Sequence, residues 1–448
     1  MEQLIKDISN LVYDASQIDK DLFEQYNVKR GLRNADGTGV LVGLTNVGDV
    51  IGYKKEDGKV IPVPGELRYR GYCIGSLVHG CQAEKRHGFE ETIFLLLAGR
   101  LPNKAELDEL MEFLGRQADL DENITQMILN LSGKDMMNML SRSVLGLYTL
   151  DEKAEDYSLS SLIQQSLNLI AKLPAIVVYS YYSMQHRYNR KTLKIRHPKA
   201  GLTFAENFLY MLKGNTYLPI EAELLDLALM LHADHGGGNN STFATRLLSS
   251  SMTDTYSAIA AGIGSLKGRL HGGANLQVLE MMENVKKHVK NWNDKEEVKQ
   301  YLLKILRKEA YDKTGIIYGV GHAVYTISDP RAILLKERAK YLAQEKGTID
   351  EYNLYCLIED LAPVVFAEFK GEGIKTVCIN VDFYSGFVYE SINIPKELFT
   401  PIFAISRMAG WAAHRLEEVT FSSKRIIRPA YKNIFPNATE AYPPLDKR

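Results

Sequence analysis

The chain has 448 residues, of which 45% are hydrophobic and 24% charged, and its formal net charge is −1 at pH 7. This length predicts two or three domains with large cores. Because the net charge is close to zero and both signs are interspersed, nothing indicates a nucleic-acid-binding surface.

Location is constrained by three features of the sequence. No run of uninterrupted apolar residues approaches the length that a membrane span needs. The N-terminal stretch lacks the apolar core of a signal peptide and the Arg-rich pattern of a transit peptide. The four cysteines, Cys73, Cys81, Cys356 and Cys378, have no CxxC spacing and are few for the length, which favours a reducing compartment and argues against a zinc site. We therefore expect a cytoplasmic protein that binds neither nucleic acid nor membranes.

Helical periodicity dominates the chain, and strand signals are sparse, so we expect a mostly helical protein. The first predicted element is a β-hairpin over 47–65, where Asp57-Gly58 separates two short β-branched runs. Helices are then predicted over 89–99, 162–173, 220–235, 331–346, 351–369 and 395–419. Pro401 should kink the last helix or lie near its first turn.

Glycine-rich turns between these helices carry histidines. In "LHADHGGGNNSTFATRLL" the helix is expected to end at His232–His235, and Ser241 or Thr242 can cap the next helix. In "GSLKGRLHGGANLQVLEMMENV", His271 stands just before a helix that should begin near Ala274.

A third histidine lies in "GVGHAVYTISDPRA". Gly319 and Gly321 carry no Cβ, so the backbone there can approach another group closely. Pro330 suits the first position of a helix, and Asp329 before it is a possible cap. This places His322 on the loop and Arg331 in the first helical turn. The stretch is typical of a site that holds an anion and hydrogen-bonds a neutral group.

An aspartate completes the set. In "VCINVDFYSGFVYESI", Asp382 follows a strand-like run and precedes a helix. Three histidines and an aspartate on loops at helix edges predict a catalytic constellation, since catalytic groups favour loops held by rigid elements. The cluster His232, Asp234 and His235 could instead suggest a metal site, but no further run of ligands follows.

Each group also has a structural interpretation. Asp382 could cap a helix beginning near Ser385. His235 and His271 could be ordinary helix-end histidines bonded to backbone carbonyls. Arg407, on a predicted helix, could form a surface ion pair.

The ordered motifs give the chain a resemblance to the citrate synthase family over nearly its whole length. "GVGHAVYTISDPRA" is close to that family's signature, and the accompanying motifs are "LRYRGY", "FEETIFLLLAGRLP", "ADHGGGN", "LHGGANLQVL", "NVDFYSG", "SRMAGW" and the "RP" of "IIRP". The resemblance implies an all-α, dimeric enzyme. Such an enzyme condenses acetyl-CoA with oxaloacetate through an enol intermediate and needs no cofactor beyond the coenzyme A thioester substrate. It also implies a large domain of about 1–272 plus 384–448 and a small, mobile domain of about 273–383.

The resemblance assigns the chemistry to three residues. Asp382 would be the base that removes a proton from the thioester methyl group. His271 would stabilise charge on the thioester oxygen as a neutral donor, because a following helix N-terminus disfavours its charged form. His322 would hydrogen-bond the ketone of the acceptor.

The acceptor is a dicarboxylate, which suits guanidinium groups. Arg331, Arg407 and Arg428 match the family's three arginines, and His235 matches a histidine that binds the same substrate. By resemblance, Arg428 reaches the site of the other subunit, so the active unit would be a homodimer.

Coenzyme A is held in this family largely by backbone around the glycine-rich loop, here with Gly319 and Gly321, and by basic residues, of which Lys375 is the candidate. Two positions depart from the family's pattern. Gly236 stands where Glu is frequent, and Arg269 stands where Pro is common. Either departure could alter loop closure or substrate choice.

Two alternative functions stay open. A 2-methylcitrate synthase would use propionyl-CoA, which differs by one methylene group, and an apolar pocket discriminates such a group by only about 1–3 kcal/mol. A non-catalytic sensor of acyl-CoA or dicarboxylates would keep the same fold. Such a sensor is expected to have lost the base or a histidine, and this sequence keeps them all.

Overall fold

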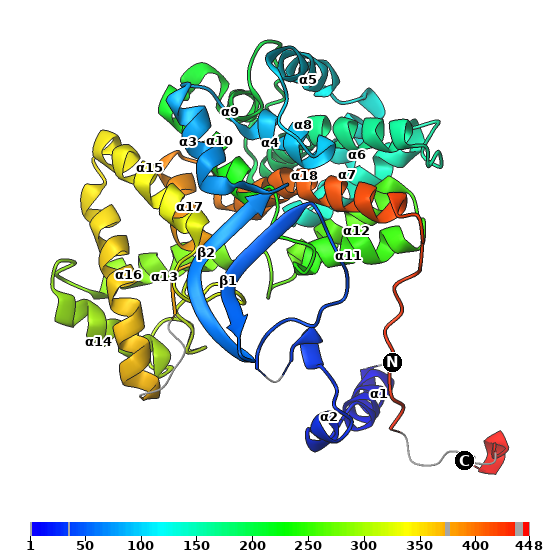
Figure 1. Ribbon diagram of the computed structural model, residues 1–448, viewed down its shortest axis with the longest axis vertical. Coiled ribbons are helices and arrows are strands. Elements are labelled where there is room, and N and C mark those ends of the chain that lie inside the picture. The colour runs from blue at the N-terminus through cyan, green and yellow to red at the C-terminus, as the bar shows by residue number, and fades with distance from the viewer. Residues whose placement is uncertain (1, 35, 372–376, 435–441, 448) are drawn as a thin grey trace.

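A computed structural model of the chain describes residues 2–34, 36–371, 377–434 and 442–447. The fold is mostly helical with one small sheet, which confirms the expected all-α class (Figure 1). The first nine helices are α1 (Glu2–Ala15), α2 (Asp21–Gln25), α3 (Ile74–Ala83), α4 (Phe89–Ala98), α5 (Lys104–Gln117), α6 (Glu122–Asn130), α7 (Met136–Leu147), α8 (Leu159–Asn189) and α9 (Phe204–Lys213). The remaining α-helices are α10 (Pro219–His232), α11 (Asn240–Ser250), α12 (Thr255–Lys267), α13 (Ala274–His288), α14 (Lys295–Leu306), α15 (Pro330–Lys346), α16 (Ile349–Lys370), α17 (Val381–Ser391) and α18 (Phe399–Thr420). Short 3₁₀ turns are η1 (Arg30–Leu32), η2 (Tyr148–Leu150), η3 (Gly214–Thr216), η4 (Lys396–Leu398) and η5 (Leu445–Lys447).

The sheet is the predicted hairpin with a short third strand. Strand β1 (Gly48–Glu56) pairs antiparallel with β2 (Lys59–Tyr69), and β2 pairs with β3 (Tyr72–Cys73). At the turn, Asp57 has φ 50° and Gly58 φ 75°, the left-handed pair that an Asp-Gly hairpin turn requires. The second strand continues four residues beyond the predicted hairpin, and β3 is too short to leave a period-two pattern.

The predicted helices exist, with shifts at their ends. Helices α4, α15 and α16 begin and end within two residues of the predicted bounds. Helix α8 is much longer than predicted because Pro174 lies inside it without ending it. Helix α10 ends at His232, three residues before the predicted end, and Pro401 lies in the first turn of α18.

Among the described residues, α8 is the one helix that is long and apolar enough to cross a membrane, judged by length and composition alone. Polar residues interrupt it, as the sequence shows, and 72% of its most apolar window is buried inside the fold. It packs against α7, α9 and α18 as a core helix of the protein.

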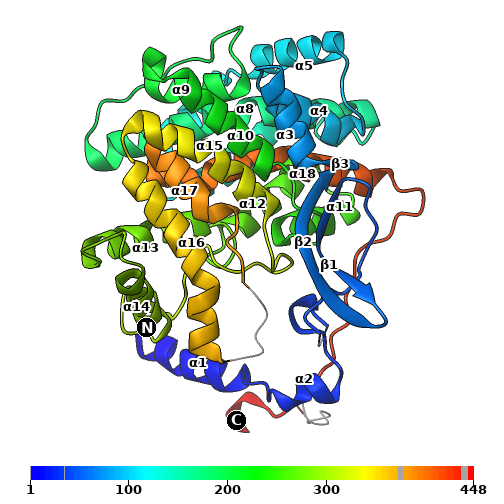
Figure 2. The same ribbon diagram turned by 60° about the vertical axis from the view of Figure 1, so that its left-hand side comes forward.

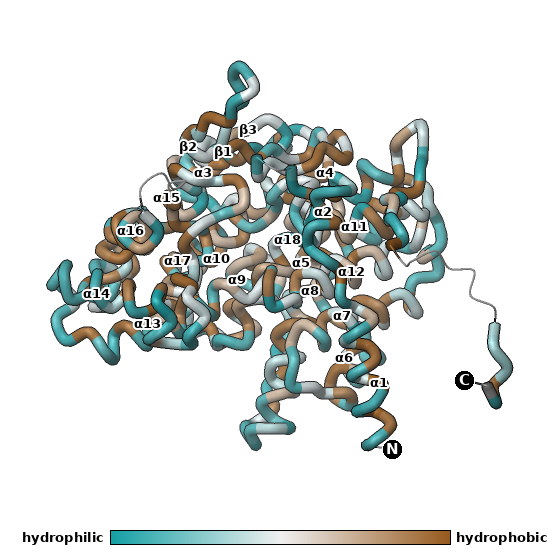
Figure 3. The backbone as a smooth tube through the Cα atoms, turned by 90° about the horizontal axis from the view of Figure 1, so that it is seen from below, coloured by the Kyte–Doolittle hydropathy of each residue, from teal (hydrophilic) through white to brown (hydrophobic). Residues whose placement is uncertain are grey.

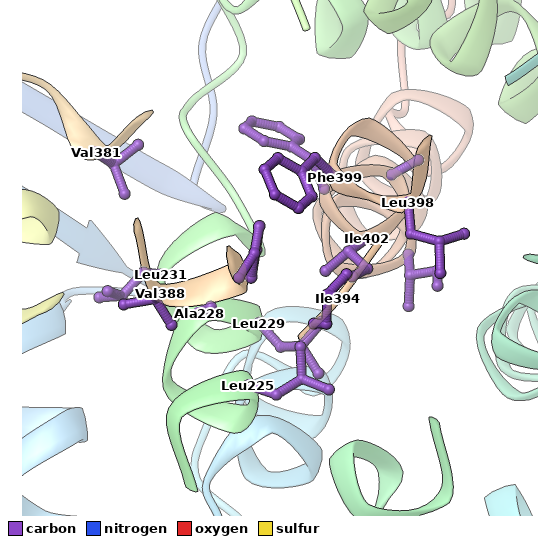
Figure 4. Packing of buried hydrophobic residues seen from close by; sticks show 14 of the residues in the cluster. Leu225, Ala228, Leu229, Leu231, Val381, Val388, Ile394, Leu398, Phe399 and Ile402 are labelled. Carbon is purple, nitrogen blue, oxygen red and sulfur yellow. The ribbon is translucent and has the colours of Figure 1, made fainter. Parts of the chain in front are cut away.

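The elements that carry the candidate site share one hydrophobic core. Leu225 and Leu229 of α10 pack with Val388 of α17 and Ile402 of α18 (Figure 4). Helix α18 is buried along most of its length, with Trp411 fully enclosed. Close packing of this kind leaves the helices little freedom to shift, so residues at their ends are held in fixed positions.

The two ends of the chain extend away from the helical body. Helices α1 and α2 and the segment after α18 lie at its margin (Figures 1 and 2). The ammonium of Lys432 lies 5.6 Å from the ring centroid of Tyr26, so the two terminal segments meet. Helix α1 carries both hydrophobic and hydrophilic residues along its tube (Figure 3). It buries no residue, and its Leu4, Ile8 and Leu11 are exposed.

Helices α13 to α17 form a group at one side of the molecule (Figure 2). There α14 packs on α16, and α13 and α15 pack on α17. The division into a large domain of 1–272 and 384–448 and a small domain of 273–383 stays a prediction.

Candidate active site

Two of the predicted histidines are in direct contact. His235 follows α10 and His322 lies on the loop before α15, and their Nε2 atoms are 3.0 Å apart. Nδ1 of His322 accepts backbone N–H groups from Val324 at 3.1 Å and Tyr325 at 3.0 Å. The proton of His322 is therefore on Nε2 and is donated to His235. Burial, aided by Arg331, lowers the pKa of His322 to about 4, so the ring is a neutral donor at neutral pH.

The glycines of the loop tie it to the segment before α17. Gly319 and Gly321 have φ of 77° and 94°, in the region that favours glycine. The N–H of Gly321 donates to the carbonyl of Cys378 at 2.7 Å, and the N–H of Asn380 donates to the carbonyl of Gly319 at 2.9 Å. A Cβ at Gly319 would lie 2.8 Å from the Val278 side chain. The close approach predicted from the glycines is thus an approach to the protein's own residues.

Asp382 lies within a helix rather than before one. Helix α17 begins at Val381, and its cap is Asn380, whose side chain accepts the N–H of Asp382 at 3.0 Å. The expectation of a helix beginning near Ser385 is wrong, because Asn380 supplies a cap five residues earlier. Burial raises the pKa of Asp382 to about 6, and the nearby Arg331 opposes this shift.

His271 lies in the turn before α13, as predicted. Its Nε2 accepts the backbone N–H of Ser241 at 3.3 Å, so its proton is on Nδ1. Burial first, and Arg407 second, lower its pKa to about 4, which makes it a neutral donor. The predicted caps Ser241 and Thr242 are wrong, because Asn239 caps α11 and leaves the N–H of Ser241 shared with His271.

Arg331 is buried at the start of α15 and paired with its own cap. Its Nε and Nη2 donate to the two carboxylate oxygens of Asp329 at 3.0 and 2.7 Å. Asp329 also accepts the N–H groups of Arg331 and of Val381, at 3.0 and 3.2 Å. This carboxylate therefore joins the first turns of α15 and α17, and so holds Arg331 near Asp382.

Arg407 is fully buried on α18, so the alternative of a surface ion pair is wrong. Its Nε donates to the carbonyl of His232 at 2.6 Å, and its guanidinium carbon lies 4.7 Å from the ring centroid of Phe403. Within the described part of the chain, Nη1 and Nη2 are buried and have no hydrogen-bond partner. Burial lowers the pKa of Arg407 to about 10. Two buried donors without acceptors are suited to a carboxylate.

These groups act on one another electrostatically. Arg331 and Arg407 both oppose the upward shift in the pKa of Asp382, and both add to the fall that burial causes in the pKa of His235. The arrangement combines two buried cations, neutral imidazole donors and a carboxylate that ionises near pH 6. Such a site can bind a dianion and take a proton from a weakly acidic carbon.

A family model described as citrate synthase, C-terminal domain, matches residues 35–430. The chain belongs to the citrate synthase family. It is accordingly an acyltransferase of the citrate synthase type.

The relatives and the solved structures agree with this family. Citrate synthase 2 of Bacillus subtilis is 38% identical over 85% of this chain and 93% of its own length. The 2-methylcitrate synthase of Shewanella oneidensis is 32% identical over 81% of this chain and 87% of its own length. Citrate synthase from Pyrobaculum aerophilum has a TM-score of 0.73 at 31% identity, covering 91% of this chain and 94% of that one. The ternary complex of the Thermoplasma acidophilum citrate synthase with carboxymethyl coenzyme A and oxaloacetate has a TM-score of 0.75 at 26% identity, covering 94% of this chain and 99% of that one.

The third arginine matched to the citrate synthase family lies apart from the others. Arg428 is exposed on the segment after α18, where it lines a cavity of 570 Å³ with Gly237, Gly238 and Arg246. None of the hydrogen bonds or ion pairs found within the described ranges joins Arg428 to the buried groups. Lys375, the candidate for coenzyme A, lies outside the described residues.

The possible metal ligands of the "HADH" turn, residues 232–235, each contact a different partner. The ring of His232 packs on Phe403 with centroids 4.4 Å apart, and Asp234 bonds to His414 at 3.1 Å. His235 bonds to His322, as described above. Over the ranges that the structure describes, no group of three or more His, Cys, Asp or Glu side chains is placed to hold a metal ion.

The sequence did not predict two of the groups that build this candidate site. Asp329 was expected only as a cap, although its position two residues before Arg331 also allows a salt bridge within the same turn. Ser241 was expected as a cap, and its backbone contact with His271 carries no signal in the sequence, because any residue except proline has an N–H.

Proposed function

We propose that this enzyme condenses acetyl-CoA with oxaloacetate and water to give citrate and coenzyme A. Asp382 is the base, His271 the donor to the thioester oxygen and His322 the donor to the ketone. His235, Arg331 and Arg407 bind oxaloacetate, and the loop of Gly319 and Gly321 with Lys375 binds coenzyme A.

One observation supports this choice of acceptor above the others. Nη1 and Nη2 of Arg407 are buried, charged and without an acceptor in the described part of the chain. A buried unpaired charge is costly, and a carboxylate in bidentate contact would satisfy both nitrogens. With Arg331 as a second cation nearby, a dicarboxylate fits the site better than a monoanion.

The chemistry follows from the protonation states of the side chains. Asp382 takes a proton from the methyl group of acetyl-CoA, and the electron pair moves to the thioester oxygen. The Nδ1–H of His271 stabilises that oxygen, which yields the enol intermediate. The enol carbon then attacks the ketone carbon, and the ketone oxygen accepts a hydrogen bond from Nε2–H of His322. In the structure this N–H is donated to His235. Water finally hydrolyses the new thioester to release coenzyme A.

The test is the release of free thiol from acetyl-CoA with and without oxaloacetate. We expect release that depends on oxaloacetate and that persists in a chelator, because we propose no metal or other cofactor. Equal release with and without oxaloacetate, for both acetyl-CoA and propionyl-CoA, would contradict an enzymatic role and favour the sensor alternative.

The acyl preference belongs to the same assay. The relatives include a 2-methylcitrate synthase at 32% identity as well as citrate synthases at 35–38%. We propose acetyl-CoA as the preferred donor because the more similar of these relatives are citrate synthases. A higher kcat/KM with propionyl-CoA, measured side by side, would assign 2-methylcitrate synthase activity instead.

We further propose that the active form is a cytoplasmic homodimer in which Arg428 completes the partner's site. The exposure of Arg428, on a segment that leaves the helical body, supports delivery to a second copy. Exposed Phe421, Ile426 and Tyr431 on the same segment give it apolar side chains to bury in such a dimer.

A further inference from the structure

A chain of buried polar side chains leads from the surface to the "HADH" turn. Asp234 and His414 are fully buried, and Oδ1 of Asp234 lies 3.1 Å from Nε2 of His414. Nε of Arg246 lies 3.1 Å from Nδ1 of the same histidine. Arg246 in turn pairs with Glu418 at 2.6 Å and with Glu417 at the end of α18. None of these five residues has a role in the proposed chemistry.

The hydrogen bonds of this chain run in one direction. The guanidinium of Arg246 can only donate, so Nδ1 of His414 accepts. The remaining proton of His414 is then on Nε2 and is donated to Asp234. Oδ2 of Asp234 accepts the N–H of Gly236 at 2.8 Å, so each carboxylate oxygen has a donor. His414 thus links the guanidinium to the carboxylate and orients both.

The position of Asp234 is tightly confined. A Cβ at Gly48 would lie 2.1 Å from its Oδ2, and a Cβ at Gly410 would lie 2.7 Å from its Oδ1. The N–H of Gly410 also donates to the carbonyl of Ala233 at 3.1 Å. The turn is therefore held by backbone and side chain together, directly before His235.

Both ends of this turn carry groups of the active site. His235, which follows Asp234, accepts the Nε2–H of His322. The carbonyl of His232, two residues before Asp234, accepts a hydrogen bond from the Nε–H of Arg407. A rotation of the turn would therefore move a substrate-binding histidine and release a substrate-binding arginine at once.

We propose that Asp234 and His414, backed by Arg246, are positioning residues that set the affinity for oxaloacetate without touching it. This inference rests on the proposed function, because it requires His235 and Arg407 to bind that substrate. Removing one member of a buried charged network lowers folding stability as well as changing local geometry, so the test measures folding and substrate affinity separately.

The test compares two substitutions of the same histidine. His414→Leu removes both hydrogen bonds and should weaken oxaloacetate binding at least about tenfold, since small displacements in a binding site have effects of this size. His414→Gln keeps an acceptor for Arg246 and a donor for Asp234, and should stay within about threefold of wild type. Oxaloacetate Kd is measured by calorimetry and KM by thiol release, with KM for acetyl-CoA expected to change much less.

The neighbouring Arg415 provides a matched control. It lies on the same helix, is equally buried, and bonds to Thr255 and Ser249, each at 3.2 Å. Arg415→Met should lower the melting temperature and leave the Kd of oxaloacetate unchanged, because its hydrogen-bond partners lie on α11, on α12 and on the segment between them, and none lies in the turn.

Two results would overturn the proposal. One is a folded His414→Leu variant with the oxaloacetate affinity of the wild type, and the other is an equal loss of affinity in Arg415→Met. If His414→Leu does not fold, the oxaloacetate affinity of Asp234→Asn is measured instead. In that variant one of the two donors to Asp234, Nε2–H of His414 or N–H of Gly236, faces an amide N–H₂ in place of a carboxylate oxygen. Wild-type affinity in Asp234→Asn would also overturn the proposal. Failure of the proposed function is separate, since the wild type itself would then neither bind oxaloacetate nor release coenzyme A.

Discussion

Asp382 can accept a proton only after it has lost its own. Because burial raises the pKa of Asp382 to about 6, the carboxyl group is protonated below that pH and ionised above it. We predict that kcat/KM for acetyl-CoA falls about tenfold per pH unit below about pH 6 and is level above it.

A profile measured from about pH 5 to about pH 8 would show this limb, since kcat/KM reports the ionisation of the free enzyme. Asp382→Asn should lose about 10²- to 10⁴-fold in kcat and lose the limb with it. A profile that stays level down to about pH 5 would mean that Asp382 is not the base.

The two buried arginines should behave differently when removed. Arg331→Leu leaves the buried carboxylate of Asp329 without its cation, which costs about 3–5 kcal/mol of folding stability. Within the described residues Arg407 has no carboxylate in contact, and Arg407→Leu removes one hydrogen bond, to the carbonyl of His232. The melting temperature of Arg407→Leu should therefore fall less than that of Arg331→Leu. Both variants should lose at least about tenfold in kcat/KM for oxaloacetate, as expected for a lost charge-assisted hydrogen bond.

Thermal unfolding and steady-state kinetics of the two variants separate these effects. An Arg407→Leu variant that melts as early as Arg331→Leu would show that Arg407 contributes as much to folding stability as Arg331 does. Unchanged kinetics in either variant would remove that arginine from the oxaloacetate site.

At the scale of elements, the β-hairpin is a support for the His322 loop. A Cβ at Gly52 would lie 2.4 Å from the carbonyl oxygen of Val324, the residue whose N–H holds Nδ1 of His322. Gly52→Ala should therefore displace this loop and lower kcat/KM at least about tenfold, although it touches no substrate.

Gly80→Ala on α3 is the matched control, because a Cβ there meets nothing within 4 Å. In a helix this change stabilises by about 0.5–1 kcal/mol and should leave the kinetics unchanged. Wild-type kinetics in Gly52→Ala would show that the hairpin does not position His322.

The element scale also shows how far the sequence could predict the fold. Repeating apolar positions and the Asp-Gly turn were enough for the hairpin and for the existence of the main helices. The ends of helices were less predictable where several capping residues compete, as with Asn239 before Ser241 and Asn380 before Asp382. Pro174 lies inside α8 although a proline removes one helical hydrogen bond, and the packing of α8 against α7, α9 and α18 is not visible in a local pattern.

For the candidate site, the sequence was enough to propose residues but not the contacts between them. Motif order placed the histidines, Asp382 and two arginines, and the structure brings these into one electrostatically coupled group. The links that hold them, such as Asp329 with Arg331 or Asp234 with His414, join residues whose partners follow only from packing. Such links could not be read from one sequence.

At the scale of the whole molecule, the proposed homodimer makes a complementation test possible. Homodimers of Asp382→Asn lack the base, and homodimers of Arg428→Leu lack one substrate contact, so both should be poorly active. In a mixed dimer with Arg428 acting on the partner, both lesions fall in one site and the other site is intact. Activity should then return towards about half of the wild-type value, because one of the two sites is intact and the two sites act independently.

Mixed dimers are made by co-expression and confirmed by mass spectrometry, and their rate is compared with that of each homodimer. If Arg428 serves its own chain, each site keeps one lesion and no activity returns. A monomer in solution, found by sedimentation, would contradict the shared site as well.

The bridge between Val320 and Ile379 has a consequence for how the chain folds. The helices form from contacts three and four residues apart, whereas Asn380 bonds to Gly321 across 59 residues and His235 meets His322 across 87. Closing such long loops is slow compared with helix formation, because chain entropy must be lost before the contact forms. After dilution from denaturant, ellipticity should therefore recover earlier than catalysis, and the amides of Gly321 and Asn380 should be among the last to gain protection from hydrogen exchange.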